Sequence, residues 1–418
     1  MTEQSLSIKE PSFTAADGTF ALLKSGTQPD DFDPYPLFHR LRRHAPVWQS
    51  PWGDWYVSSF DAVARAFVHP ACALSPWGKH AREANPGNMD SRLADVIGDW
   101  LLFADPAEHE RLRQELVKPL TPAAVGAFEP LIAEICRSLL PENGASRVEI
   151  VSTLTQPLPV AVIACLVGIP PADRDRIAVW ARALRVILDT PQSGAPTVQD
   201  SLAEMREYFL ALAQDPAWLR AQEAAGGNGL SPLIRKFPAE VAAANLAILV
   251  FAGHETTVHL MGSLLFHLAL RPHVWALLRA RPELIQNAIA ESLRLESPIQ
   301  KMCRWSSAPL ELAGHAVSPR QTLVLLLGAA NRDPARFANP DDFVIERDAS
   351  SHLSFGRGRH QCLGRLLAML EASTLLRVLL PRWKSVSVED GGFRWLNNSS
   401  FRGLRRLELA WEPGGAAE

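Results

Sequence analysis

One long apolar segment limits what this chain can fold into. Residues 239–270 have a helical composition and are nearly all apolar, apart from Glu240, Asn245, a polar cluster at residues 253–257 and three later histidine or serine positions. A helix that is apolar on every side is stable only where other parts of the protein surround it. The chain has 418 residues, enough to bury a large core around such a helix. The segment therefore predicts a large, mainly helical protein with a buried central helix.

The polar cluster in this segment is costly to bury. A carboxylate and two hydroxyls inside a protein need hydrogen bonds, water or opposite charge to compensate them. Thr256 lies four residues after Ala252, so its hydroxyl can bond the Ala252 carbonyl or open a groove in the helix. Gly253 should leave room for a ligand on the same side. We interpret the cluster, with Glu255 as its acid, as functional.

A second informative stretch is FGRGRHQCLG at residues 355–364, which ends where an apolar helical run begins. Its glycines allow positive φ and a close approach of the backbone to a flat ligand. Cys362 should lie at a helix N-terminus, where N–H groups stabilise a thiolate, and Arg359 and His360 should lower the pKa of its thiol further. An ionised sulfur suits a metal ligand, whereas the alternative is a buried free cysteine beside a turn.

This stretch resembles the heme-binding loop of the cytochrome P-450 family, whose spacing is found at Phe355, Gly358, Cys362 and Gly364. The resemblance implies the P-450 fold, mainly α with a small β region, in which a long central helix crosses a heme b group. It implies Cys362 as the ligand of the heme iron, and a thiolate ligand favours O–O cleavage.

Residues 252–257 resemble the oxygen-activation motif of the same family. By that resemblance O₂ is the co-substrate, Thr256 holds water or oxygen beside the iron, and Glu255 relays protons from solvent. His254 and Glu255 also begin like the zinc-protease motif His-Glu-x-x-His, but the next histidine is His259. This spacing turns the two imidazoles about 140° apart on a helix, whereas the zinc motif needs about 40°. A zinc hydrolase therefore remains only a formal competitor.

Four further residues stand where the family binds the two heme propionates: His109, Arg113, Arg304 and His360. Carboxylates at a buried edge need cationic or hydrogen-bonding partners. His109 and Arg113 are four residues apart and therefore share one helix face. Each residue alone would be interpreted as a solvated surface cation, so their assignment to the heme depends on the resemblance.

A helix pair resembles the family's structural Glu-x-x-Arg motif. Glu291 and Arg294 are spaced to lie side by side on a helix. In the family a basic residue from a downstream segment completes this network, but Asp342 stands where many relatives carry arginine. We expect Arg347 to take that place.

The rest of the chain contains no linker, repeat or charge block that would divide it. We expect residues 1–30 to form a flexible tail and residues 31–418 to form a single domain, with an irregular 70–100 loop as part of a pocket wall. Periodicity predicts a helix at 33–43, a hairpin from 46–49 and 55–58, and further short strands at 310–312, 322–326 and 407–411.

The composition argues against several classes of protein. A net charge of −3 without a basic block gives no sign of nucleic-acid binding. The five cysteines lack CxxC spacing, which argues against a disulfide framework or a cysteine-rich zinc site and favours a reducing, cytoplasmic location. No signal pattern and no uncharged apolar run of about 18 residues indicates a membrane span.

The chain carries no flavin or iron–sulfur motif, so electrons must come from other proteins. The resemblance implies a ferredoxin and an NAD(P)H-dependent ferredoxin reductase, steered to a basic patch of Lys118, Arg357, Arg359 and Arg365. We predict a monooxygenase that hydroxylates or epoxidises a small, largely apolar molecule of secondary metabolism. The alternatives are a heme-thiolate ligand binder or sensor without turnover, and a desaturase or coupling variant of the same enzyme class.

The substrate pocket is expected to be largely apolar, with a few polar groups. Leu249, Phe251, Ile299 and Met302 are the expected apolar lining. Asn397, Asn398 and Ser399 could hydrogen-bond a polar handle of the substrate.

Overall fold

The computed structural model describes residues 30–74, 97–141, 146–189, 196–226 and 229–414. The expected tail at residues 1–30 lies outside the described residues except for Asp30, and so does most of the 70–100 loop.

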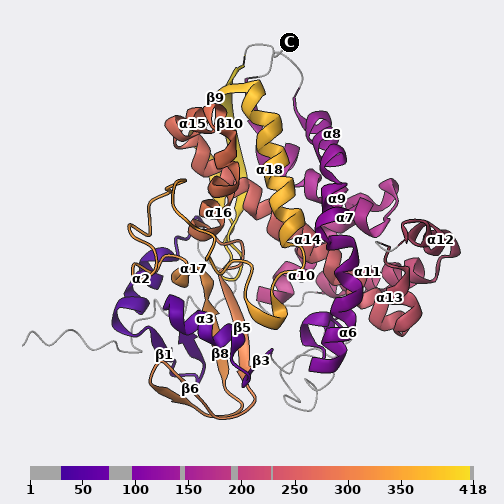
Figure 1. The fold of residues 1–418 in the computed structure, drawn as a ribbon, viewed down its shortest axis with the longest axis vertical. Helices are drawn as coiled ribbons and strands as arrows, with labels where there is room; N and C mark the ends of the chain where they lie inside the picture. Colours follow the sequence, from indigo (N-terminus) through magenta and orange to yellow (C-terminus); the bar gives the residue numbers. More distant parts are fainter. Residues whose placement is uncertain (1–29, 75–96, 142–145, 190–195, 227–228, 415–418) are drawn as a thin grey trace, which may run out of the picture.

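Helices make up most of the described chain, and α14 runs through their middle (Figure 1). Their bounds are α2 Tyr35–His44, α3 Phe60–Val68, α6 Pro106–Leu116, α7 Pro122–Gly126, α8 Glu129–Leu139, α9 Pro157–Val167, α10 Arg174–Asp189, α11 Pro196–Gln214, α12 Pro216–Ala224, α13 Ser231–Lys236, α14 Ala239–Ala269, α15 Pro272–Ala280, α16 Ile285–Leu295, α17 Leu327–Ala330 and α18 Arg365–Arg382.

The strands form small sheets at two ends of the molecule (Figure 1). One sheet has the order β1-β2-β8-β5-β3, with β2 and β8 parallel and the other pairs antiparallel. A second sheet has the order β4-β10-β9, and β6 pairs with β7. The bounds are β1 Val47–Gln49, β2 Trp55–Val57, β3 Cys72–Ala73, β4 Arg147–Glu149, β5 Lys301–Ser306, β6 Leu310–Leu312, β7 His315–Val317, β8 Thr322–Leu326, β9 Trp383–Trp395 and β10 Leu404–Pro413.

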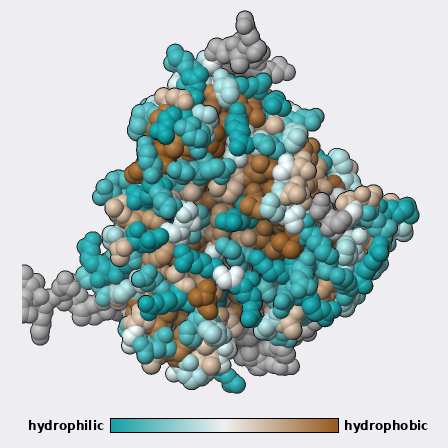
Figure 2. All heavy atoms as spheres, in the orientation of Figure 1, coloured by the Kyte–Doolittle hydropathy of each residue, from teal (hydrophilic) through white to brown (hydrophobic). Residues whose placement is uncertain are grey.

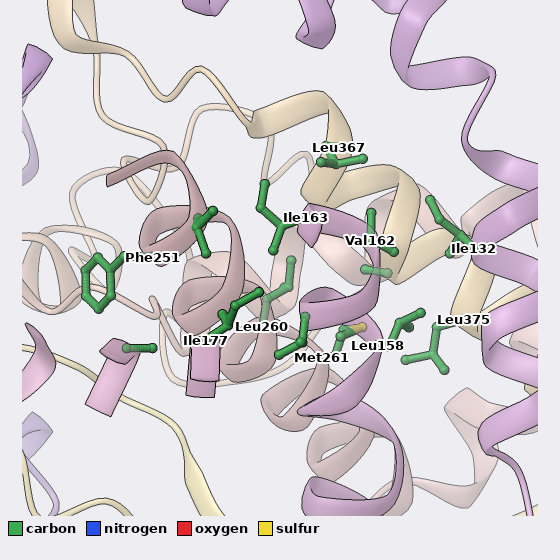
Figure 3. Close-up of a cluster of buried hydrophobic side chains, with 14 of the residues drawn as sticks. Ile132, Leu158, Val162, Ile163, Ile177, Phe251, Leu260, Met261, Leu367 and Leu375 are labelled. Atoms are coloured by element: carbon green, nitrogen blue, oxygen red, sulfur yellow. The ribbon is translucent and has the colours of Figure 1, made fainter. Parts of the chain in front are cut away.

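The predicted central helix is confirmed as α14, and its surroundings explain its composition. It begins after Pro238 and ends just before Arg271 and Pro272, since proline cannot continue a helix. Figure 3 shows Leu260 and Met261 of α14 among side chains from neighbouring helices, including Leu158 of α9. Of the described helices, α14 alone has the length and hydropathy of a membrane span, and most of its apolar window is buried inside the protein.

Hydrophilic residues cover most of the face seen in Figure 2, with apolar residues visible near its middle. This distribution agrees with a core built around α14, because one continuous apolar cluster joins this helix to α9, α16 and α18.

Most predicted elements are confirmed, and five strands were missed. The helix at 33–43 is α2, the hairpin pairs Val47 with Val57, and the three short strands are β6, β8 and β10. The prediction missed β3, β4, β5, β7 and β9, of which β3 lies in the expected irregular loop. The β5 sequence KMCRWS and the β9 sequence, with its Gly-Gly pair, show no clear alternation; β5 is a strand because it pairs with β8, and β9 because it pairs with β10.

Candidate active site

One face of α14 is partly accessible over the turns before Thr257. Every residue from Thr257 to Ala269 is buried, yet a stripe on the preceding turns is accessible. The stripe recurs at helical spacing, so it lies on a single side of the helix. Its members are Ala244, Ile248, Leu249, Ala252, Gly253 and Thr256.

Thr256 stands at the inner end of this stripe. Its hydroxyl donates to the Ala252 carbonyl over 2.8 Å, as the sequence predicts. The helix continues without interruption through both residues, so the alternative of a groove in the helix is not what forms. The prediction that Gly253 leaves room for a ligand was wrong. A Cβ built on Gly253 would lie 2.8 Å from Ile163 Cδ1, so the missing side chain allows α9 to pack closely.

Glu255 is buried beside the stripe. Its Oε1 accepts hydrogen bonds from Arg185 Nη1 of α10 at 2.8 Å and from His259 Nε2 at 3.2 Å. Burial alone would raise the pKa of this carboxyl, but the hydrogen bond from His259 and the charge of Arg185 hold it below its ordinary value. Glu255 is therefore an ionised carboxylate next to the Thr256 stripe, and within the described residues no hydrogen bond joins it to Thr256.

The zinc alternative receives no support from this cluster. His254 Nδ1 lies 4.0 Å from Glu255 Oε2, while His259 approaches Oε1 from the next turn. Within the part of the chain that the structure describes, no three His, Cys, Asp or Glu side chains are arranged to hold a metal ion.

The cysteine loop has the backbone that its glycines predict. Gly356 and Gly358 have φ of +62° and +71°, where glycine is favoured. A Cβ on Gly358 would also lie 3.2 Å from Val68 Cγ1, so this residue lets the loop approach α3. The Cys362 N–H donates to the Phe355 carbonyl at 2.9 Å and closes the loop just before α18.

The Cys362 sulfur is accessible, and it lies among groups that favour a thiolate. Burial raises the pKa of the thiol, and the backbone N–H groups of Gly364 and Arg365 and the charges of Arg113 and Arg365 oppose that rise. The N–H donors and cations act in the predicted direction, but the cations are Arg113 and Arg365 rather than Arg359 and His360. Burial outweighs them and raises the pKa of the thiol, so the predicted lowering of this pKa was wrong.

The four predicted propionate residues come together beside this loop. The rings of His109 and His360 lie 4.3 Å apart, and Arg113 Nη2 donates to the Gln361 carbonyl at 2.9 Å. Arg304 is only 1% exposed and lies over the Phe67 ring at 5.0 Å. We call His109, Arg113, Arg304 and His360 the cation cluster.

Desolvation and mutual repulsion act on this cluster. Burial, followed by the positive charges of its neighbours, lowers the pKa of His109 to about 4 and that of His360 to about 3. Burial lowers the pKa of Arg304 to about 10. No described carboxylate forms an ion pair with Arg113 or Arg304, although a buried cation needs an anion. The cluster therefore fits a ligand that brings its own negative charge.

A family model described as Cytochrome P450 matches residues 219–399. The Biotin biosynthesis cytochrome P450 of Bacillus subtilis (strain 168) is 32% identical over 403 residues, covering 93% of this chain and all of the relative. The chain belongs to the cytochrome P450 family. Its relatives are monooxygenases and hydroxylases, and it is an oxidoreductase of this kind.

Further relatives agree. Cytochrome P450 monooxygenase PikC of Streptomyces venezuelae is 32% identical over 415 residues, which cover 95% of this chain and 96% of the relative. The structure of P450BioI in complex with hexadec-9Z-enoic acid ligated acyl carrier protein has a TM-score of 0.82 at 30% identity, with 91% of this chain and 98% of that chain covered. The structure of CalO2 has a TM-score of 0.81 at 29% identity, covering 92% and 97%. The predicted P450 fold is thereby confirmed.

The heme iron of the P450 family fits the residues present. The cation cluster supplies positive charge without acidic partners, and the cysteine loop supplies the Cys362 sulfur with N–H donors around it. Without a bound anion the cation cluster would destabilise the protein, because a buried cation without a partner is costly.

The Glu-x-x-Arg pair forms a closed structural network. Arg294 Nε and Nη2 donate to both oxygens of Glu291 at 2.7 and 2.8 Å, and neither side chain is exposed. Arg347 Nε donates to Glu291 Oε1 at 3.1 Å, so the prediction that Arg347 replaces the missing partner is confirmed. Asp342 contributes its backbone carbonyl, which accepts from Arg294 Nη2 at 3.0 Å.

The four residues of the expected basic patch separate into different environments. Arg357 and Arg365 line a recess of about 520 Å³ beneath the cysteine loop, together with Glu346 and Asp348. Lys118 instead pairs with the buried Glu115, and Arg359 acts on the two histidines of the cation cluster. The patch at this recess is therefore smaller and more mixed in charge than predicted.

The expected polar handle for a substrate is mostly used within the protein. Asn398 Oδ1 accepts from the backbone N–H groups of Ser400 and Phe401 at 2.9 and 2.7 Å, and Ser399 Oγ accepts from Lys301 Nζ at 2.7 Å. These bonds shape the turn, and Phe401 then meets the Phe251 ring edge-on. For Asn397, a hydrogen bond to a polar group of the substrate stays a prediction.

Two residues of the site were missed from sequence. His259 is four residues after Glu255, a spacing that places two side chains next to each other on one helix face. This spacing could have identified His259 as a partner of Glu255. Arg185 has no sequence signal, because it comes to Glu255 from α10, 70 residues away along the chain.

Proposed function

We propose that this P450 binds heme b and uses O₂ to hydroxylate or epoxidise a small, largely apolar molecule of secondary metabolism. Electrons come from a separate ferredoxin and an NAD(P)H-dependent ferredoxin reductase in the cytoplasm. Residues 31–418 act as one domain in this reaction.

The observation that carries the proposal is the cation cluster beside the Cys362 loop. Its buried members lack acidic partners within the described residues, and a heme brings two carboxylates. We assign His109, Arg113, Arg304 and His360 to the heme carboxylates and Cys362 to the iron. A bound heme-thiolate supplies the chemistry that activates oxygen.

The chain's own residues would then position the substrate and control protons. The accessible stripe of α14 offers Leu249 and Ala252 as apolar contacts for the substrate. The Thr256 hydroxyl, anchored to the Ala252 carbonyl, orients water or oxygen at the inner end of that stripe. Glu255, ionised and connected to the partly exposed Arg185, exchanges protons with solvent.

The relatives support the reaction type and the substrate class. The 6-deoxyerythronolide B hydroxylase of Saccharopolyspora erythraea is 30% identical over 398 residues, and a Polyketide biosynthesis cytochrome P450 of Bacillus subtilis is 31% identical over 326 residues. For electron delivery, Arg357 and Arg365 at the recess beneath the cysteine loop give an acidic ferredoxin a docking charge.

The test is the reduced carbon monoxide spectrum of protein expressed with added heme precursor. We expect the spectrum of a thiolate heme for the natural protein and for Cys303→Ser, a matched change at an exposed cysteine. Cys362→Ser should abolish that spectrum. A colourless protein, or an intact thiolate spectrum in Cys362→Ser, would contradict the proposal.

A further inference from the structure

His259 has no part in the site as the family resemblance describes it. Its ring is 3% exposed on α14, and its Nε2 lies 3.2 Å from Glu255 Oε1. Its Nδ1 is buried and has no hydrogen-bond partner within the described residues. A buried imidazole that makes one bond, and makes it to the proposed proton carrier, needs an explanation.

Packing holds this ring in place. A Cβ built on Gly403, next to β10, would lie 2.0 Å from His259 Nδ1 and 2.4 Å from Cγ. Only a glycine leaves room for the ring at that point. The imidazole is thereby held between α14 and the chain entering β10, with Nε2 directed at Glu255.

The same geometry selects one form of the ring. The bond to the Glu255 carboxylate requires a hydrogen on Nε2, because an ionised carboxylate only accepts. A second hydrogen on Nδ1 would be a buried donor without an acceptor, which is costly. The neutral ring with its hydrogen on Nε2 satisfies both conditions.

The two oxygens of Glu255 are in different situations. Oε1 accepts from both Arg185 and His259. Oε2 has no donor within hydrogen-bond distance in the described part of the chain, and His254 Nδ1 is 4.0 Å away. A carboxylate anchored through one oxygen can take up and release a proton at the other without losing its orientation.

We propose that His259 is a positioning residue for proton transfer, which together with Arg185 anchors Glu255 Oε1 and leaves Oε2 to exchange the proton. This inference rests on the proposed function. It adds a residue outside the acid and alcohol pair, and Gly403 as the residue that makes room for it.

The first experiment reads the ring directly. In protein labelled with ¹⁵N-histidine, as the diamagnetic reduced carbon monoxide complex, the signals absent from His259→Gln identify His259. We expect a neutral ring with hydrogen on Nε2. An imidazolium, or a ring with hydrogen on Nδ1, overturns the inference even where the carbon monoxide spectrum upholds the proposed function.

The second experiment measures proton-dependent reduction of O₂. The holoenzyme receives electrons from a plant-type ferredoxin and its reductase, with O₂ as the sole acceptor, in H₂O and in D₂O. We expect His259→Phe to slow NAD(P)H oxidation about fivefold, the equivalent of one hydrogen bond, and to enlarge the solvent isotope effect. His259→Gln keeps a donor and should stay within about twofold of the natural protein.

Gly403→Ala provides an independent route to the same loss, because its methyl group displaces the ring. Gly262→Ala is the matched control, since its Cβ would meet only Leu404 at an ordinary 4.0 Å. Heme content and the carbon monoxide spectrum show that each variant is folded. Unchanged rates and isotope effects in both His259→Phe and Gly403→Ala overturn the inference, and a protein that binds no heme overturns the proposed function with it.

Discussion

Glu291 and Glu255 are both buried glutamates on helices that meet an arginine, yet their surroundings differ. Glu291 accepts from Arg294 on both oxygens and from Arg347 and the Val344 N–H on Oε1. Arg294 uses all five of its N–H groups, the remaining ones on the backbone carbonyls of residues 331, 340 and 342. Glu255 instead accepts through one oxygen, from Arg185 and His259.

The difference indicates a structural role for the Glu291 and Arg294 pair and a chemical role for Glu255. A fully bonded pair such as Glu291 and Arg294 has no free position for a proton or a ligand, so it can only hold α16 to the segment below the cysteine loop. Within the described residues, Glu255 Oε2 accepts no hydrogen bond, and Arg113 and Arg304 of the cation cluster form no ion pair with a carboxylate. Incomplete pairing of buried charges is what we expect where a protein binds a charged ligand or transfers a proton, and it agrees with the roles proposed for Glu255 and the cation cluster.

The largest expected effect comes from breaking the complete pair. Arg294→Met should lower the free energy of unfolding by about 3–5 kcal/mol, because it leaves Glu291 charged and buried with fewer donors. Urea unfolding of the holoprotein measures this. Arg185→Met is the matched change at the incomplete pair, where the arginine is 22% exposed and His259 still donates, and its effect should be smaller. Equal losses in the two variants would remove the distinction.

Glu371 on α18 extends the comparison to a buried glutamate without any cation. It is 1% exposed, its Oε2 has no partner among the described residues, and burial raises its pKa well above the ordinary value. Above the ordinary carboxyl pKa the unfolded chain binds fewer protons than the folded one, so stability falls as pH rises towards the raised pKa. Each pH unit in that window costs up to about 1.4 kcal/mol.

Glu371→Gln should therefore flatten the decline of unfolding free energy between pH 5 and pH 8. Gln cannot ionise, although its amide adds a buried donor that shifts the whole curve. The measurement is the slope from urea unfolding at each pH, with Glu283→Gln, at an exposed surface glutamate, as control. Parallel curves for the natural protein and Glu371→Gln would show that Glu371 does not stay neutral.

The cation cluster predicts opposite effects with and without heme. Arg304→Met removes a buried charge that lacks an acidic partner, so the apoprotein should be as stable as the natural one or more stable. Heme should bind about ten- to a hundredfold more weakly, the value of a charged hydrogen bond. Heme transfer to apomyoglobin measures this, with the exposed Arg406→Met as control. A less stable apoprotein together with an unchanged heme affinity would contradict the assignment of Arg304 to a heme carboxylate.

Thr256→Ala should have the smallest effect on the structure and a selective effect on oxygen reduction. We expect it to keep heme and to raise the ratio of peroxide to water formed from NAD(P)H by about a hundredfold, at the low end of what positioned proton-transfer groups contribute. Thr257→Ala, at a neighbouring buried hydroxyl, is the control. An unchanged ratio in Thr256→Ala would defeat its role.

Sequence reasoning found the residues whose spacing is local. The Glu291 and Arg294 pair, the Thr256 bond to Ala252 and the turns of the cysteine loop all lie within a few residues, so helix and turn geometry predicts them. Arg347 was predicted because the network needs a basic residue from the downstream segment, where Asp342 cannot supply one. Strands β5 and β9 were missed because their sequences do not alternate and only distant partners make them strands.

The sequence by itself determined the family, the central helix, the thiolate loop and the types of side chain around them, because these depend on short-range spacing and on apolar periodicity. Only the tertiary structure decided which groups pair. It brought Arg185 of α10 to Glu255, placed Ile163 against Gly253, and left the cations of the cluster without acids. Charge and hydrogen-bond balance depends on distances across the fold, and residues far apart along the chain carry no local signal of them.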